Sequence, residues 1–178
     1  ELVRHVDRRR RDAAELLLAA QAVAPGISFT AAGATLVRSR TKESTPHKVW
    51  AHHPDTGHRV DVKREESHAF WTWAVVEVLR ATGVRIEELL EITHHSLVQY
   101  RLPSTGELVP LLQIAPSKTD SERLLLVNPE LADVLATILR RIRDDTGAVP
   151  FVAAFDPHER TWHPPAPFLF QRRVGTER

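Results

Sequence analysis

The 178-residue chain contains no cysteine, no methionine and a single tyrosine, Tyr100. Without cysteine it can form neither disulfides nor thiolate metal sites, which agrees with a reducing cytoplasm, the location that we expect. The absence of methionine, even at position 1, leads us to expect a piece of a longer protein. No apolar run approaches the roughly 18 residues that a membrane-spanning helix needs, so we expect no membrane partner.

The chain also lacks an excess of charge of one sign. It has 24 Lys and Arg residues against 23 Asp and Glu residues, and its formal net charge is +1. A nucleic-acid-binding domain usually has a pI above about 9, whereas the pI of this sequence is about 8.5. Because cations gathered on one face can still bind DNA, the balance disfavours this function class without excluding it.

Hydrophobic spacing predicts a mixed α/β, helix-rich fold with a small antiparallel β-hairpin sheet. A first helix is expected over residues 6–24 and ends at Pro25-Gly26, before a less regular stretch of short β-like pieces. Further along we expect helices over 65–83, 85–93 and 129–142, strands over 96–102, 108–115 and 123–127, and a short apolar strand at 167–170.

Two cations stand in positions that suit phosphate chemistry. The segment ATGVRIEELLEI, residues 81–92, places Arg85 after a Thr-Gly helix stop and Glu88 one helical turn later. About 30 residues on, Lys118 lies in the polar tip of the predicted hairpin QIAPSKTDSERLLLV. Cleavage of a phosphodiester without a metal gathers negative charge on the non-bridging oxygens, which the planar fork of arginine stabilises. The leaving oxygen needs a proton, which a lysine can donate, while Glu88 can hold the Arg85 guanidinium in position.

These motifs resemble those of the tyrosine recombinase, or phage-type integrase, family. The T-G-x-R-x-x-E-L pattern around Arg85 is similar to the first arginine box of that family, and the SKTD turn is similar to its β-hairpin lysine. The resemblance implies cleavage of double-stranded DNA through a 3′-phosphotyrosyl intermediate, followed by rejoining, with no cofactor. It makes Arg85 the first catalytic arginine and Lys118 the general acid, and it implies a homo-oligomer on DNA in the full-length protein.

The chain departs from the family pattern at two points. An H-x-x-R box should follow the apolar segment 167–170, but the one match, His5 to Arg8, lies upstream of the arginine box and is treated as chance. The nucleophile is also lacking, because Tyr100 falls inside a predicted strand and is expected to be structural. We therefore expect the fragment alone to be inactive, with the missing catalytic residues in a longer parent.

The resemblance also suggests a division of the chain into three parts. Residues 1–26 would be a helical linker from an upstream DNA-binding region, 27–62 an irregular β-containing segment, and 63–178 the N-terminal part of the recombinase catalytic domain. The competing function is a non-catalytic DNA-binding or interaction module on the same scaffold. A metal-dependent nuclease is disfavoured, because the chain lacks a clustered set of carboxylates.

Several other residues allow both a functional and an ordinary structural interpretation. The arginine run can be a solvated helix face, or it can contact the DNA backbone as the segment before the catalytic domain does in the family; it comprises Arg8, Arg9, Arg10 and Arg11. His94 and His95 follow the arginine helix and can contact a phosphate. The remaining histidines match no standard zinc spacing, so no metal is expected. Of the two tryptophans Trp71 and Trp73, we expect Trp73 in the core and Trp71 partly exposed.

Overall fold

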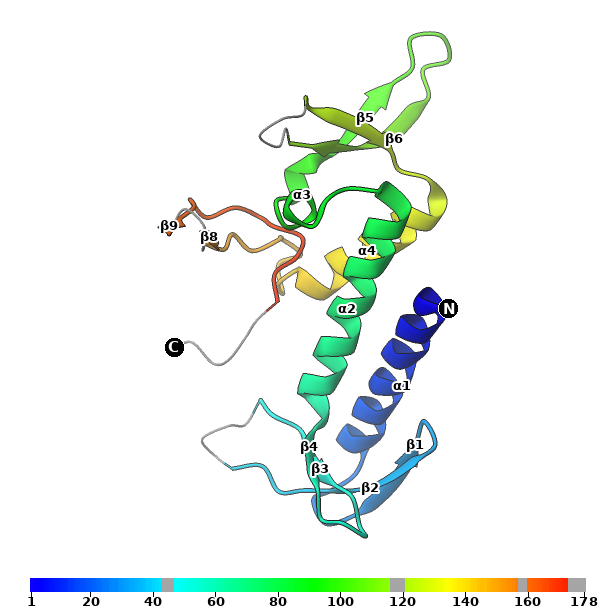
Figure 1. Ribbon diagram of the computed structural model, residues 1–178, viewed down its shortest axis with the longest axis vertical. Helices are drawn as coiled ribbons and strands as arrows, with labels where there is room; N and C mark the ends of the chain where they lie inside the picture. Colours follow the sequence, from blue (N-terminus) through cyan, green and yellow to red (C-terminus); the bar gives the residue numbers. More distant parts are fainter. Residues whose placement is uncertain (43–46, 116–120, 157–159, 173–178) are drawn as a thin grey trace. The chain divides into compact units, whose positions relative to one another are not determined.

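The computed structural model describes residues 1–42, 47–115, 121–156 and 160–172, and its elements are labelled in Figure 1. Within them the fold is mixed α/β, with four α-helices and small antiparallel sheets, which confirms the predicted class at that level. The chain divides into two compact units, Glu1–Val76 and Glu77–Arg178. Each unit is described by itself below. The predicted division of the chain into residues 1–26, 27–62 and 63–178 stays a prediction.

The first unit combines a helix with a four-stranded antiparallel sheet. Helix α1 spans Leu2–Ala22, and the strands follow one another in the sheet in sequence order; they are β1 (Ser28–Ala31), β2 (Ala34–Arg38), β3 (Trp50–His52) and β4 (Arg59–Asp61). Ala32 and Gly33, both with positive φ, make the two-residue turn between β1 and β2. Such turns match the right-handed twist of a hairpin, and glycine adopts positive φ without strain.

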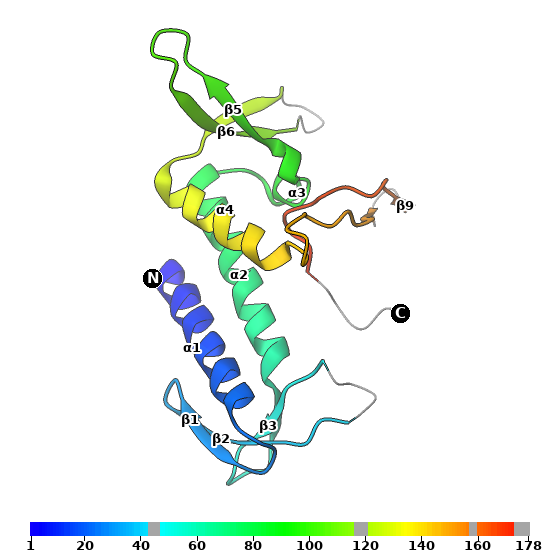
Figure 2. The same ribbon diagram turned by 180° about the vertical axis from the view of Figure 1, so that it is seen from behind.

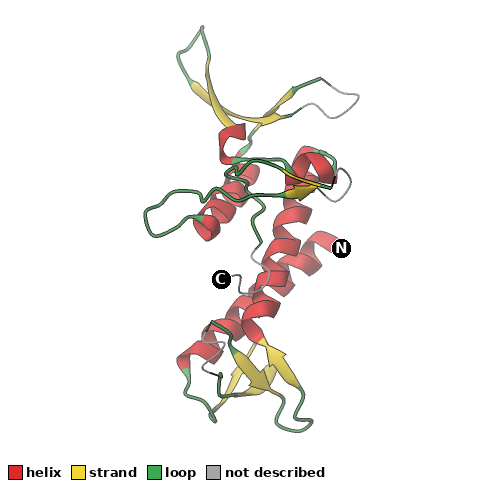
Figure 3. Ribbon diagram, turned by 90° about the vertical axis from the view of Figure 1, so that its left-hand side faces the viewer, coloured by secondary structure: helices red, strands yellow, loops and turns green. Residues whose placement is uncertain are grey.

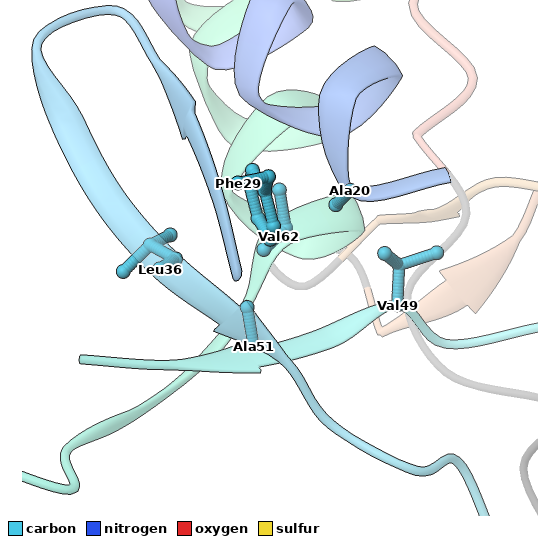
Figure 4. Packing of buried hydrophobic residues seen from close by; sticks show 6 residues of the cluster. All are labelled: Ala20, Phe29, Leu36, Val49, Ala51 and Val62. Atoms are coloured by element: carbon cyan, nitrogen blue, oxygen red, sulfur yellow. The ribbon is translucent and has the colours of Figure 1, made fainter. Parts of the chain in front are cut away.

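The core of the first unit forms where α1 covers this sheet. Phe29 and Leu36 are paired across β1 and β2, and both are buried. Figure 4 shows them with the other members of the buried cluster, which are Ala20, Val49, Ala51 and Val62. Alternate strand residues point inward, so short strands with an apolar residue at every second position suffice to build this layer.

Helix α2 spans Val62–Thr82 and carries an aromatic cluster in the first unit. Trp73 is buried, as predicted, but Trp71 is buried as well, at 7% and 8% exposure. The prediction that Trp71 is partly exposed is therefore wrong. The ring of Phe70 meets that of Trp71 edge to face at 5.2 Å, an arrangement that aromatic rings favour. The helix thus buries aromatic rings on more than one of its faces.

The second unit contains a three-stranded antiparallel sheet in the order β5-β6-β7. Figure 2 labels β5 and β6 of this sheet, and Figure 3 draws the strands in yellow. Its elements after the end of α2 are α3 (Ile86–Leu90), the 3-10 turn η1 (His94–Ser96), β5 (Leu97–Arg101), β6 (Leu108–Ile114), β7 (Arg123–Leu126), α4 (Pro129–Ile142), β8 (Phe155–Asp156) and β9 (Thr161–Trp162). The three predicted strands of the sheet are confirmed to within one residue at each end. Helix α3 is shorter than predicted and ends at Leu90.

Helix α4 begins and ends where its sequence signals place it. The Asn128 side chain accepts a hydrogen bond from the Leu131 N–H at 2.8 Å, and Pro129 occupies the first turn. Beyond Ile142, Asp144 closes the following turn by accepting hydrogen bonds from Thr146 and Ala148. These contacts hold the pKa of Asp144 below its ordinary value, the Thr146 hydroxyl contributing most, while burial opposes them.

The core of the second unit brings together α3, the sheet, α4 and the segment near residue 169. Its most deeply buried side chains are Leu89, Ile92, Leu112, Ile114, Leu131, Ile138 and Leu169. The predicted strand at 167–170 is instead an extended segment with a single bridge, Thr93 to Phe168. The Leu169 N–H donates to the Ile92 carbonyl at 2.9 Å, which explains why α3 does not continue through residue 93. Along the described part of the chain, no helix is long and apolar enough to cross a membrane.

Candidate functional site at the start of helix α3

The Thr-Gly pair before Arg85 ends helix α2, as the sequence predicts. The Thr82 hydroxyl donates to the Val78 carbonyl at 2.6 Å, and the Gly83 N–H donates to the Leu79 carbonyl at 2.9 Å. Gly83 then turns the chain with φ of +67°, in the left-handed region that glycine tolerates best. Arg85 follows as the N-cap residue of α3, with an extended backbone and an exposed side chain.

The buried carboxylate of Glu88 holds this turn in place. Glu88 is only 4% exposed. Its Oε2 accepts a hydrogen bond from the backbone N–H of Arg85 at 2.9 Å. The same oxygen accepts a second bond from Nη2 of Arg123 at 2.6 Å. Glu88 therefore fixes Arg85 through the backbone N–H of Arg85. The expected support of the Arg85 guanidinium by Glu88 stays a prediction.

These partners keep Glu88 ionised. The N–H of Arg85 is the largest influence and lowers the pKa of the Glu88 carboxyl. Burial opposes it by raising the pKa, and the charge and hydrogen bond of Arg123, followed by the charge of Arg85, lower it again. The balance lies below the ordinary pKa of glutamate, so Glu88 is a buried anion at neutral pH.

Arg123 is the site residue that sequence reasoning missed. It begins β7 and pairs with Ile114 across the sheet, so its side chain lies on the same face as the buried Ile114 and Leu112. A signal was available in the sequence. In the segment RLLLV, Arg123 lies on the same face as Leu125 and Val127, the face that points toward the core. A cation on that face needs a partner of opposite charge.

Lys118 lies outside the described residues, so its predicted role stays a prediction. Its place in the sequence falls between the end of β6 at Ile114 and the start of β7 at Arg123. On either side of that connection, the Gln113 amide donates to the Glu122 carboxylate. The strands that lead into and out of the lysine-bearing segment are thus held together at Gln113 and Glu122.

The two candidate histidines lie on η1, shortly after α3. His94 is half-buried, and its backbone N–H donates to the Pro167 carbonyl at 2.8 Å. His95 is exposed, and its ring lies 6.2 Å from that of Phe151. The two imidazole rings are 6.5 Å apart. Contact with a phosphate by either histidine stays a prediction.

The arginine run on α1 belongs to the first unit, and its members differ in their surroundings. Arg10 stacks over the Trp73 ring at 4.4 Å and also donates to Asp7 at 3.2 Å. Arg11 forms an ion pair with the other oxygen of Asp7 at 2.9 Å. Arg10 therefore contributes to packing, because a guanidinium on an aromatic face is held by the ring electrons as well as by its carboxylate.

Arg8 and Arg9 line an open hollow of about 350 Å³ in the first unit. Arg9 is 3.7 Å from a carboxylate oxygen of Glu65, an exposed and therefore weak ion pair. The lining of the hollow is mostly apolar and includes Leu16 and Leu36. The predicted contact of these arginines with the DNA backbone stays a prediction.

Two further observations bear on the chemistry of the site. Among residues 1–42, 47–115, 121–156 and 160–172, no group of three or more His, Cys, Asp or Glu side chains could hold a metal ion. Tyr100 lies on β5 opposite Val109 and is 51% exposed. The structure therefore places the one tyrosine of the chain on a strand.

The chain was compared with known protein families, proteins and structures. The chain matches no protein-family model, no curated protein and no solved structure.

Proposed function

We propose that this chain is part of a DNA breaking-rejoining enzyme of the tyrosine recombinase type, which acts on double-stranded DNA as a homo-oligomer. In this proposal Arg85 binds the scissile phosphate and Lys118 donates the proton to the leaving 5′-oxygen. The observation that carries the proposal is the buried Glu88 carboxylate, which joins the start of α3 to β7 through Arg85 and Arg123.

A phosphate-binding arginine must be exposed and yet fixed in direction. Arg85 has an exposed side chain, while its backbone is anchored to a carboxylate that is almost fully buried. Such anchoring fixes the backbone from which the Arg85 side chain extends, so less backbone entropy is lost when the arginine binds an anion. Preorganised charge is the largest contribution to many catalysed phosphoryl and acyl transfers.

The same carboxylate reaches a distant part of the sequence. Arg123 lies 35 positions beyond Glu88 and begins the strand that follows the Lys118 connection. The start of β7, which follows Lys118 in the sequence, and the turn carrying the proposed phosphate ligand therefore share one buried support. This arrangement supports a joint role for two cations that the sequence separates.

The proposed reaction is a transesterification. A tyrosine hydroxyl attacks the phosphorus and forms a P–O bond to the tyrosine, while the bond to the 5′-oxygen breaks and that oxygen takes a proton from Lys118. The tyrosine loses its proton to a base, and rejoining runs the same steps in reverse. Because Tyr100 lies in the middle of β5, we propose that it is not this nucleophile.

Salt-dependent DNA binding tests the role of Arg85. Replacing one phosphate-contacting cation lowers affinity for every duplex sequence and reduces the slope of log K against log salt by about 1. We therefore expect Arg85→Ala to show both effects when fluorescence anisotropy is measured over a series of salt concentrations. The matched control is Arg143→Ala, which removes an exposed arginine at the end of α4. Equal slopes for Arg85→Ala and the unaltered chain would contradict the proposal.

The second candidate is a DNA-binding module without catalysis, which the strand position of Tyr100 favours. The two candidates differ in the covalent product. A full-length parent that follows the recombinase mechanism forms a phosphotyrosyl link to a nicked duplex, and the Arg85→Ala variant does not. DNA binding that depends on Arg85 without any covalent link in the parent would favour the binding module.

A further inference from the structure

Strand β7 is an edge strand with two exposed leucines. The order β5-β6-β7 leaves one side of β7 without a neighbour in the sheet. Leu124 is 57% exposed and Leu126 is 64% exposed. An edge strand with apolar side chains and unpaired backbone groups is a template for pairing with another strand, and natural proteins usually block such edges.

The hydrogen-bond pattern of the sheet shows which backbone groups of β7 point outward. The Val127 N–H donates to the Pro110 carbonyl at 3.0 Å, and these residues continue the register of β6 and β7. Bonded and non-bonded pairs alternate along an antiparallel ladder, so Leu125 and Arg123 also bond to β6. The N–H and C=O groups of Leu124 and Leu126 therefore point away from β6, and nothing in the described chain pairs with them.

The opposite edge of the sheet is protected in a way that β7 is not. The Leu102 N–H donates to the Glu107 carbonyl at 2.8 Å, so by the same alternation Arg101 points its backbone groups outward from β5. Its long guanidinium side chain donates to the Gly106 carbonyl at 3.2 Å. A charged residue on an edge opposes the approach of another strand. The stretch Leu124–Val127 contains no charge at all.

The leucines of β7 also extend an apolar face across the sheet. Paired residues share a face, so Leu124 and Leu126 lie on the side of the half-buried Leu111 and Val109 and of the exposed Tyr100. The buried Leu112 and Ile114 lie on the other side, toward the core. This outward face belongs to the second unit alone.

We propose that β7 pairs antiparallel with β7 of a second copy of this chain, around Leu125. In this register Leu124 of one copy lies opposite Leu126 of the other. By symmetry, Leu126 of the first copy lies opposite Leu124 of the second. Each pair exchanges two backbone hydrogen bonds through the groups that point outward. An interface of this kind is isologous, because the same surface serves both copies.

Charge supports a second copy as the occupant. In the proposed register Arg123 lies opposite Val127 of the second copy, and Glu122 lies opposite Asn128. No like charges meet, and every exposed leucine gains a leucine neighbour on the same face. Cross-strand apolar pairs of this kind stabilise a sheet, whereas like charges directly opposite would destabilise it.

The paired surface is small. Stable interfaces bury at least about 1,200 Å² in total, and a pair of four-residue strands covers less. The dimer is therefore weak and depends on concentration. Binding of two copies side by side on one duplex would raise their effective concentration to the order of millimolar and favour the pairing. The pairing itself does not depend on the proposed catalytic function.

Sedimentation velocity over a wide range of protein concentrations tests the pairing. The unaltered chain is expected to shift from monomer toward dimer as concentration rises. Leu126→Pro removes only an outward N–H, so it leaves the bonds to β6 intact and should stay monomeric. Leu126→Lys should stay monomeric too. The matched control is Leu18→Lys, which replaces an exposed leucine on α1, away from β7 in the sequence. This variant should dimerise like the unaltered chain.

Circular dichroism of each variant checks that the fold is retained, and amide hydrogen exchange at Leu124 and Leu126 locates the contact. Protection of these two amides that rises with concentration supports the proposal. A chain that stays monomeric at every concentration would overturn it, as would dimerisation of both Leu126 variants at the level of the unaltered chain. Protection of the β7 amides by an unrelated extended peptide, with no self-association, would assign the edge to a different partner.

Discussion

Glu88 is the residue on which the candidate site depends. A buried carboxylate is tolerated only when it is paired and hydrogen-bonded, and Glu88 obtains both from Arg85 and Arg123. Removing one partner of a buried ion pair costs more than the pair contributes, because the other charge is left unpaired. The three residues should therefore behave as one unit when any of them is changed.

The lowered pKa of Glu88 gives a testable dependence of stability on pH. A carboxyl group with a lowered folded-state pKa contributes stability above its ordinary pKa, about 4.3 for glutamate, and this contribution is lost as pH falls through the folded-state pKa. In urea unfolding, the free energy of unfolding of Glu88→Gln should be lower than that of the unaltered chain at neutral pH. This difference should shrink as the pH falls into the acid range.

The matched control for this prediction is Glu107→Gln, which changes an exposed carboxylate next to β6. Its unfolding free energy should follow that of the unaltered chain at each pH. If the Glu88→Gln profile also runs parallel to that of the unaltered chain across the acid range, the carboxylate of Glu88 does not stabilise the fold.

Sequence reasoning identified Arg85 and Glu88 because a helix stop and a helical spacing are local patterns. The partner of Arg123 was beyond its reach for a physical reason. The partner lies 35 positions away, and only the folded sheet brings β7 next to α3. A pattern of neighbours in sequence can mark a cation that needs a buried partner, but it cannot say which carboxylate provides it.

Among the elements, the turn between α2 and α3 determines where α3 begins and so where Arg85 lies. Gly83 has φ of +67°, and a Cβ added there would meet no heavy atom within 4 Å. The cost of Gly83→Ala is therefore one of backbone strain, roughly 1–2 kcal/mol for an L-residue in the left-handed region. Gly83→Asn should cost less, because asparagine tolerates this region better.

Thermal unfolding of the two Gly83 variants checks this expectation. The alanine variant should have the lower midpoint, and the asparagine variant should lie between it and the unaltered chain. Equal midpoints for all three proteins would mean that the turn at Gly83 relaxes into a different backbone conformation and does not fix the start of α3.

The predictability of the elements follows from their length and pattern. Helix α4 and strands β5, β6 and β7 have clear apolar periods and sharp end signals, such as Asn128-Pro129, so their residues could be assigned in advance. The four strands of the first unit also fall on short β-like pieces of the sequence, but their pairing into one sheet could not be assigned, because β3 and β4 have only three residues each. Strands this short carry too few residues for a period of two to stand out.

At the scale of the whole chain, the order of elements was predictable but the division into units was not. The boundary at Glu77 falls inside the continuous helix α2, where no proline, glycine or change of composition marks it. The burial of Trp71 escaped prediction for a related reason. Which faces of a helix are covered depends on long-range packing, not on the helix's own sequence.

The central claim is that the buried Glu88 carboxylate supports phosphate binding by Arg85. A double-mutant cycle on duplex-DNA affinity at fixed low salt tests it most directly, with Arg85→Ala, Glu88→Gln and the double variant. Residues that act as a unit show non-additive effects. We predict that Arg85→Ala weakens DNA binding strongly in the unaltered chain and much less once Glu88 is glutamine. Strictly additive losses of affinity, or no loss for Arg85→Ala, would contradict the claim.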